Sequence, residues 1–158
     1  MHTSTTSTVP LEPWTPEQLQ EATQGEWLHG NIPQGAIKRI LTDSRHAEVG
    51  DVFLALKGER FDAHDFVAQV ATQGCQIAIV ERPIEVDIAQ LVVKDTRLAL
   101  GDLGAYRRKQ NAHLKVIALT GSSGKTTTKE MLGSILSRLA PTLITRGNLN
   151  NDLGVPMM

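Results

Sequence analysis

The stretch that most constrains this chain runs from residue 116 to residue 128 and reads VIALTGSSGKTTT in one-letter code. A short apolar run with β-branched residues occupies 116–119, and a polar loop with two glycines follows it. The segment after Lys125 then has apolar residues at helical spacing. This order predicts a strand, a tight loop and the start of a helix.

The residue types in this loop suit a phosphate chain. Unpaired backbone N–H groups at a helix N-terminus and in a glycine-rich loop converge on an anion, and Gly121 and Gly124 let the main chain approach it. The Lys125 ammonium would reach the outer phosphates, and the Thr126 hydroxyl is placed to bind Mg²⁺. Leu119 stands where the full P-loop pattern has glycine, so a strand-to-helix connection with glycines for packing is the alternative interpretation.

Composition argues against several other classes of protein. Sixteen basic and seventeen acidic residues give a formal charge of -1, so no overall field favours nucleic acid or an anionic membrane. The apolar runs are too short to cross a membrane and the N-terminus lacks a signal-peptide pattern, so we expect a cytoplasmic protein without membrane attachment. Cys75 is the single cysteine, which argues against a disulfide framework and predicts a small packing residue.

The pattern of residues 15–110 predicts a small α/β domain that follows a mobile tail at 1–14. Thr15 and Gln18 are expected to form the capping box of a short helix that Gly25 ends. We expect strands at 36–42, 51–56, 77–80 and 91–93, a further helix capped by Asp62 and another capped by Asp95 or Thr96.

Polar clusters at 42–45 and 57–66 follow two of the expected strands, and ligands of open α/β sheets bind beyond such strand ends. Residues 114–158 contain one strand–loop–helix–strand unit whose last strand is expected at 142–145. Its helix is expected to bury Met131, Leu132, Ile135, Leu136 and Leu139. Because a P-loop domain needs a larger parallel sheet, we expect 114–158 to be the beginning of a second domain that continues beyond this chain.

Four motifs together resemble the Mur ligases of peptidoglycan synthesis. They are T-D-S-R at 42–45, the run at 50–66, V-K-D-T-R at 93–97 and T-G-S-S-G-K-T at 120–126. The resemblance covers roughly residues 15–158 in the expected order, which is more specific than any single motif, and the shorter loop without glycine is normal for that family. The closing G-N-L-N-N-D-L-G-V-P resembles the family member that adds D-alanyl-D-alanine.

This resemblance implies an ATP-dependent amide ligase. Its amino-terminal α/β domain would hold the UDP end of the substrate, and its central α/β domain would hold ATP. ATP would phosphorylate the terminal carboxylate of UDP-N-acetylmuramoyl-tripeptide, and the amine of D-alanyl-D-alanine would attack the acyl phosphate. The full-length protein is expected to be a monomer, and the 158-residue chain by itself is not expected to ligate.

Carried over by position, the resemblance assigns residues to the two nucleotides. The ATP-binding residues are Gly121, Ser122, Ser123, Gly124, Lys125, Thr126 and Thr127. Among them, Lys125 would be catalytic and Thr126 would bind Mg²⁺, because phosphoryl transfer asks for positioning and charge neutralisation. Ser44 and Arg45 occupy positions where the family contacts the diphosphate of the nucleotide. The alternative is that these two residues form an ordinary turn at the end of a strand.

Two further groups of residues are assigned to the substrate. His64 and Asp65 fall on the uridine side, with a helix cap and a solvated histidine as the alternative. The amides of Asn148, Asn150 and Asn151 would face a sugar or peptide, or serve the loop backbone. A UDP-sugar-binding module with a vestigial P-loop and a Mur ligase that adds a single amino acid are the other functions considered, whereas an unrelated P-loop kinase or GTPase leaves the motifs at 42–66 unexplained.

Overall fold

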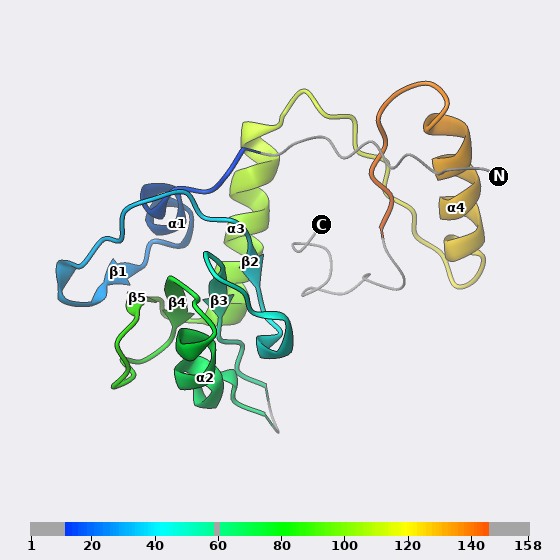
Figure 1. Cartoon of the computed structure of the whole chain (residues 1–158). Coiled ribbons are helices and arrows are strands. Elements are labelled where there is room, and N and C mark those ends of the chain that lie inside the picture. Colours follow the sequence, from blue (N-terminus) through cyan, green and yellow to red (C-terminus); the bar gives the residue numbers. More distant parts are fainter. Residues whose placement is uncertain (1–11, 59–60, 146–158) are drawn as a thin grey trace.

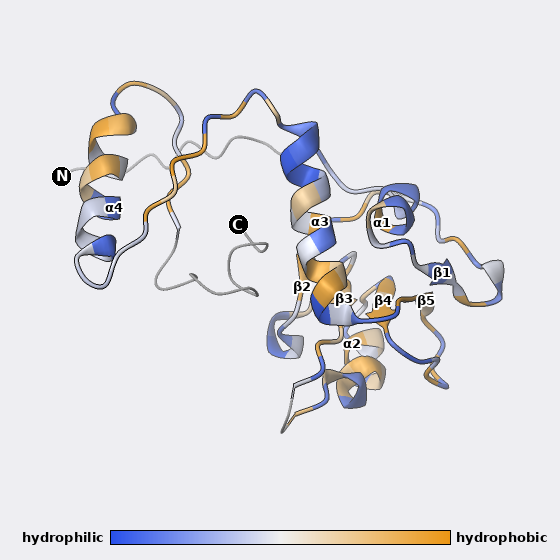
Figure 2. Ribbon diagram, turned by 180° about the vertical axis from the view of Figure 1, so that it is seen from behind, coloured by the Kyte–Doolittle hydropathy of each residue, from blue (hydrophilic) through white to orange (hydrophobic). Residues whose placement is uncertain are grey.

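The computed structural model describes residues 12–58 and 61–145. Its strands are β1 (Glu26–Trp27), β2 (Ile40–Leu41), β3 (Val52–Leu54), β4 (Ile77–Val80) and β5 (Ala89–Val92). Its α-helices are α1 (Pro16–Thr23), α2 (Val67–Thr72), α3 (Thr96–Gln110) and α4 (Lys125–Leu136), and its short 3-10 helices are η1 (Leu28–Gly30), η2 (Ser44–His46) and η3 (Ala63–Phe66). In both Figure 1 and Figure 2, α4 lies apart from the elements around the sheet.

One five-stranded sheet in the order β1-β5-β4-β3-β2 organises the part of the chain before residue 111. The strands β2, β3, β4 and β5 are parallel neighbours, and β1 pairs with β5 in the antiparallel sense. The register places Phe53 between Leu41 and Ala78. The expected α/β fold class is therefore confirmed.

Helices cover both faces of this sheet (Figure 1). Leu19 of α1 and Leu103 of α3 belong to the core on one face, and Val70 of α2 and Cys75 belong to the core on the other. The strands β3 and β4 are buried along their whole length, which explains why their sequences are continuously apolar. Burial raises the pKa of the Cys75 thiol to about 11, which agrees with the expected packing role.

The expected helix caps form. The Thr15 hydroxyl accepts from the Gln18 N–H, and the Gln18 amide oxygen accepts from the Thr15 N–H, which completes the capping box of α1. Asp95 caps α3 through its carboxylate. The left-handed residue that ends α1 is Gln24, with a φ of 53°, and not the expected Gly25. The two-residue edge strand β1 that follows was not predicted, because two residues show no periodicity.

Several elements have other bounds than the sequence suggested. The strand expected at 36–42 forms only as β2, and Ile37 instead makes an isolated bridge with Trp14. The strand expected at 51–56 is β3 alone, and the strand expected at 91–93 begins earlier, as β5. The helix expected near Asp62 begins as η3 and continues as α2. These differences of a few residues leave the topology unchanged.

The strands expected at 116–119 and 142–145 are absent from the described residues, so these two predictions are wrong for this structure. Val116 and Ile117 are exposed. An extended segment needs a neighbouring strand for its backbone N–H and C=O groups. Within the described residues 112–145, no segment pairs with either stretch.

The helix α4 forms as expected, but its apolar stripe is not buried as predicted. Met131 and Ile135 are 62% and 57% exposed, and Figure 2 shows the apolar residues of this helix. Close packing occurs at Gly133, where an added Cβ would lie 2.1 Å from the Cδ1 atom of Ile144. The segment before residue 146 thus packs against α4 at Gly133, where any larger residue would require the Ile144 side chain to move.

Candidate nucleotide and phosphate sites

Two groups of expected site residues lie at one edge of the sheet. Ser44 and Arg45 follow β2, and His64 and Asp65 follow β3. Because β2 and β3 are parallel neighbours, the loops beyond their carboxyl ends lie on the same side of the molecule. Open α/β sheets bind their ligands at this edge. We call this region the carboxyl edge.

The loop after β2 presents a paired guanidinium to solvent. The Asp43 carboxylate accepts from the Arg45 backbone N–H at 3.0 Å, which caps η2. It also accepts from Nε of the Arg45 side chain at 2.9 Å and from its Nη2 at 2.6 Å. These bonds hold the pKa of Asp43 well below its usual range. Ser44 and Arg45 therefore do sit in turn chemistry, and the Arg45 side chain is still 80% exposed.

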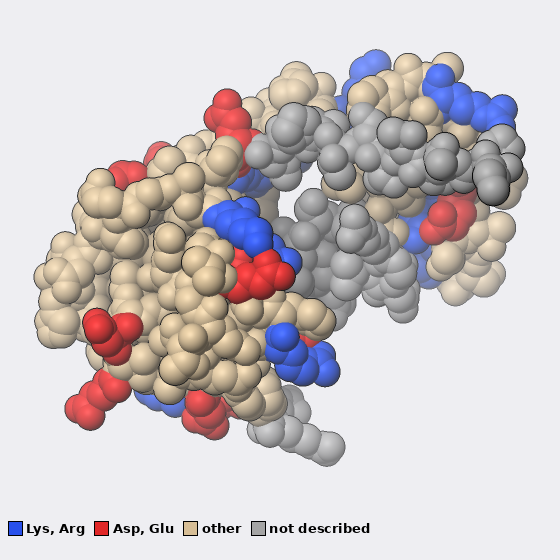
Figure 3. Space-filling model, viewed as in Figure 1, with Lys and Arg blue, Asp and Glu red and all other residues tan. Residues whose placement is uncertain are grey.

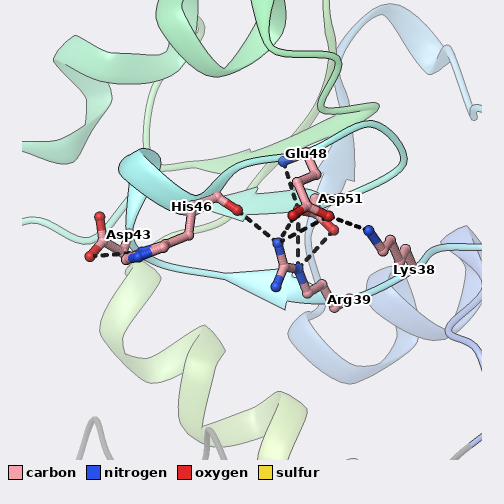
Figure 4. Close-up of polar contacts among 6 residues, drawn as sticks. All are labelled: Lys38, Arg39, Asp43, His46, Glu48 and Asp51. Atoms are coloured by element: carbon pink, nitrogen blue, oxygen red, sulfur yellow. Dashed lines mark hydrogen bonds and ion pairs between the residues drawn. The ribbon is translucent and has the colours of Figure 1, made fainter.

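A buried carboxylate holds the far end of this loop against Arg39, the residue before β2. The Asp51 side chain is fully buried and accepts from Arg39 Nε at 3.0 Å and from the Glu48 backbone N–H at 2.9 Å. The Arg39 guanidinium also donates to the His46 carbonyl at 2.7 Å. Figure 4 shows the Arg39 and Asp51 side chains pointing toward each other, with Lys38 and Glu48 forming an ion pair beside them. No local pattern in the sequence predicts the pair of Arg39 and Asp51, because a strand and a loop separate these two residues.

His64 is buried and is bonded on both sides. Its Nδ1 lies 2.5 Å from the Asp62 carboxylate, and its Nε2 accepts from the Glu81 backbone N–H at 2.8 Å. The histidine is 2% exposed, so the alternative of a solvated histidine is wrong. Of the two residues expected on the uridine side, His64 is thus buried and Asp65 is exposed.

Asp62 is an acid at this edge whose two carboxylate oxygens both accept hydrogen bonds. It accepts from the His64 backbone N–H at 3.0 Å and from Arg82 Nη1 at 3.0 Å. Its burial favours the neutral acid, but the hydrogen bonds from His64 and Arg82 outweigh this effect and lower the pKa of Asp62 to about 2.

The phosphate-type loop precedes α4. Gly124 is the residue before the helix and has a φ of 76°, a left-handed conformation that favours glycine. The Lys125 ammonium folds back and donates to the Gly121 carbonyl. Thr126 and Thr127 are exposed in the first helical turn, where backbone N–H groups have no partner within the helix. The loop amides, an ammonium and a hydroxyl therefore gather at one helix N-terminus.

The structure does not bring the loop and the carboxyl edge together, since α4 lies apart from the sheet in Figures 1 and 2. The expected positions Asn148, Asn150 and Asn151 lie outside the described residues. Basic and acidic side chains are interspersed on the face shown in Figure 3, which gives no patch of one sign. Along residues 12–58 and 61–145, no helix combines the length and the apolar character needed to cross a bilayer.

A doubly covered, mostly parallel sheet followed by a glycine-rich loop at a helix N-terminus is an arrangement typical of nucleotide-binding α/β proteins. The chain matches the catalytic domain of the Mur ligase family over residues 36–114 and the Mur ligase middle domain over residues 119–158. The chain belongs to the Mur ligase family.

Individual relatives agree with this assignment. The chain is 51% identical over 143 residues to the UDP-N-acetylmuramoyl-tripeptide–D-alanyl-D-alanine ligase of Escherichia coli K12, an alignment that covers 90% of this chain and 31% of that protein. A crystal structure of MurF from Acinetobacter baumannii is 84% identical, with a TM-score of 0.91, and the match covers 94% of this chain and 33% of that one. The chain thus spans about a third of the length of these relatives.

A more distant structure carries a nucleotide. MurF ligase from Thermotoga maritima, solved in complex with ADP, is 36% identical to this chain with a TM-score of 0.65. The match covers 75% of this chain and 28% of that one.

The burial of Asp51 predicts that two neighbouring substitutions will lower the stability of the fold by different amounts. Arg39→Ala leaves the Asp51 carboxylate buried without its cation, which we expect to cost about 3 kcal/mol of unfolding free energy. Lys38→Ala removes only the exposed Lys38–Glu48 pair and should cost less than about 1 kcal/mol. Urea denaturation of both variants measures the difference. Equal losses in the two variants would contradict an anchoring role for Arg39.

The lowered pKa of Asp62 predicts how the stability of the fold changes with pH. Because the pKa is about 2 in the folded chain and 3.8 ordinarily, the ionised carboxylate stabilises the fold above about pH 4, and this stabilisation is lost as the pH falls toward 2. Asp62→Asn should therefore be less stable than the wild type at pH 6, and the gap should narrow below pH 4. Urea unfolding at a series of pH values measures it, and a gap that widens on acidification would refute the assignment.

Proposed function

We propose that this chain supplies two substrate sites of an ATP-dependent ligase that joins D-alanyl-D-alanine to UDP-N-acetylmuramoyl-tripeptide. Family membership and the 51% identity to the Escherichia coli ligase of that name support the reaction. Because the relatives are about three times as long, the proposed activity is that of a protein of their length. We further propose that it is cytoplasmic and acts as a monomer.

The observation that carries the proposal is the loop at 121–127. A nucleotide triphosphate tail needs several N–H donors and a cation at one point. The loop offers the amides before and inside the first turn of α4, and the left-handed Gly124 keeps side-chain atoms away from them. Lys125 would exchange the Gly121 carbonyl for the outer phosphates and so place a positive charge where negative charge develops during transfer.

The residues at the loop also fit Mg²⁺. Mg²⁺ prefers oxygen ligands and commonly takes only one or two from protein, with phosphates and water completing the set. The Thr126 hydroxyl is exposed in the first helical turn, and the described residues contain no cluster of His, Cys, Asp or Glu suited to a metal ion. When bound, Mg²⁺ would neutralise charge on the phosphates. Thr126 would hold it beside Lys125.

The UDP end of the substrate would bind at the carboxyl edge. The Arg45 guanidinium and the Ser44 hydroxyl suit a diphosphate, because a guanidinium forks onto phosphate oxygens. Asp43 already orients this guanidinium, which lowers the entropy cost of binding. Asp65 is placed to accept from a uridine hydroxyl or N–H group.

The phosphate loop and the carboxyl edge would take part in one ligation reaction. The tripeptide carboxylate would take the terminal phosphoryl group of ATP to give an acyl phosphate and ADP. The amine of D-alanyl-D-alanine would then attack the acyl carbon, and phosphate would leave. Within this chain, Lys125 and the loop amides orient and neutralise the phosphates, and Ser44 and Arg45 hold the acceptor substrate. The asparagines at 148, 150 and 151 are proposed to face the sugar or peptide.

The test is Lys125→Ala in the full-length ligase, with ATP-dependent phosphate release as the readout. Without the ammonium, kcat should fall about 100-fold or more, as when one transition-state donor is removed. UDP binding should remain, because the carboxyl edge is untouched. The matched control is Lys115→Ala, which removes an exposed lysine before the loop. Turnover of Lys125→Ala at the wild-type rate would overturn the proposed function.

A further inference from the structure

A single line of hydrogen bonds joins three strand ends beneath the carboxyl edge. It starts at Asp62, which precedes η3, and passes to the buried ring of His64. Nε2 of that ring accepts from the backbone N–H of Glu81, the residue directly after β4. An accepting Nε2 places the ring proton on Nδ1, from which it is donated to Asp62.

The line continues to the start of α3. The Glu81 carboxylate accepts from both the backbone N–H and the hydroxyl of Thr96, each at 2.9 Å. Thr96 is fully buried and follows β5 by a few residues. Since β3, β4 and β5 are parallel neighbours, these bonds fix the relative positions of their carboxyl ends.

The outer end of the line reaches the surface. The second Asp62 oxygen holds Arg82, which is half-exposed, and Asp62 also closes a bridge with Lys57. The exposed Asp65 lies on the same 3-10 turn as His64. The buried His64 ring and the backbone that presents Asp65 therefore belong to one short turn.

We propose that Asp62, His64 and Glu81 are positioning residues that hold the carboxyl edge in the geometry that binds the UDP end of the substrate. The inference rests on the proposed function. A buried ring with two satisfied nitrogens has no free atom for a ligand, but its removal would leave the Glu81 N–H and the Asp62 carboxylate without their partner. The loss then appears as weaker ground-state binding of UDP, with the phosphate loop unaffected.

The experiment measures UDP affinity by calorimetry and ligation kinetics in the full-length ligase. His64→Ala should raise the UDP Kd and the KM of the UDP substrate about tenfold. The kcat and the KM of ATP should stay within about twofold of the wild type. His113→Ala, which removes an exposed histidine beyond α3, is the control and should change none of these quantities.

Two conservative variants distinguish the contributions of the two ring nitrogens of His64. His64→Gln keeps an acceptor near the Glu81 N–H, and His64→Asn keeps a donor near Asp62. We expect His64→Gln to restore more of the UDP affinity, because Arg82 still pairs with Asp62, whereas the acceptor of the Glu81 N–H is the ring itself. Should His64→Ala fail to fold, these variants and Thr96→Val carry the test, with a smaller rise in the UDP Kd for Thr96→Val.

An unchanged UDP Kd in both His64→Ala and His64→Gln would overturn the inference. A fall in kcat that accompanies equal rises in the KM of ATP and the KM of the UDP substrate would also overturn it. The two proposals fail separately. A wild-type protein that binds UDP but does not ligate would refute the proposed function, and the UDP Kd values of the variants would still decide the role of His64.

Discussion

The pairing of β3 between two parallel neighbours is the constraint on which the rest of this structure depends. Because β2 and β4 flank it in the same direction, the loops after three strands meet at one edge. Burial of β3 and β4 on both faces fixes the register, since a slip by one residue would exchange the two cores. Residues as distant as Arg45 and Asp65 are thereby brought to one side.

Buried polar groups then hold the loops that lead to and from this edge. Asp51 and Arg39 precede β3 and β2, so their pair holds the loop after β2 where it returns to the amino ends of these strands, whereas His64 ties the turn after β3 to the end of β4 at the carboxyl edge. Each is costly to bury unless fully bonded, so each specifies one loop position. Of the exposed groups that we assign to substrate, Asp65 directly follows His64, and Arg45 lies in the loop whose far end Asp51 holds. A division between buried positioning groups and exposed binding groups follows.

Local signals predicted the parts of this fold that depend on neighbours in sequence. The capping box of α1, the Asp95 cap, the apolar run of β4 and the loop before Lys125 were all predicted. The partners of Asp51 and His64 lie 12 and 17 residues away, and no pattern in the sequence indicates them. The strand expected at 116–119 failed for the complementary reason: its composition is right, but a strand also needs a paired neighbour.

We propose that the chain carries two separate nucleotide sites, one at the carboxyl edge and one at the loop before α4. Hydrogen–deuterium exchange of the full-length protein, with UDP and with an unhydrolysable Mg-ATP analogue added separately, tests it most directly. The account predicts that UDP slows exchange in peptides over residues 42–56 and leaves 120–128 unchanged, and that the ATP analogue does the reverse. Protection of 120–128 by UDP, or of 42–56 by the ATP analogue alone, would contradict it.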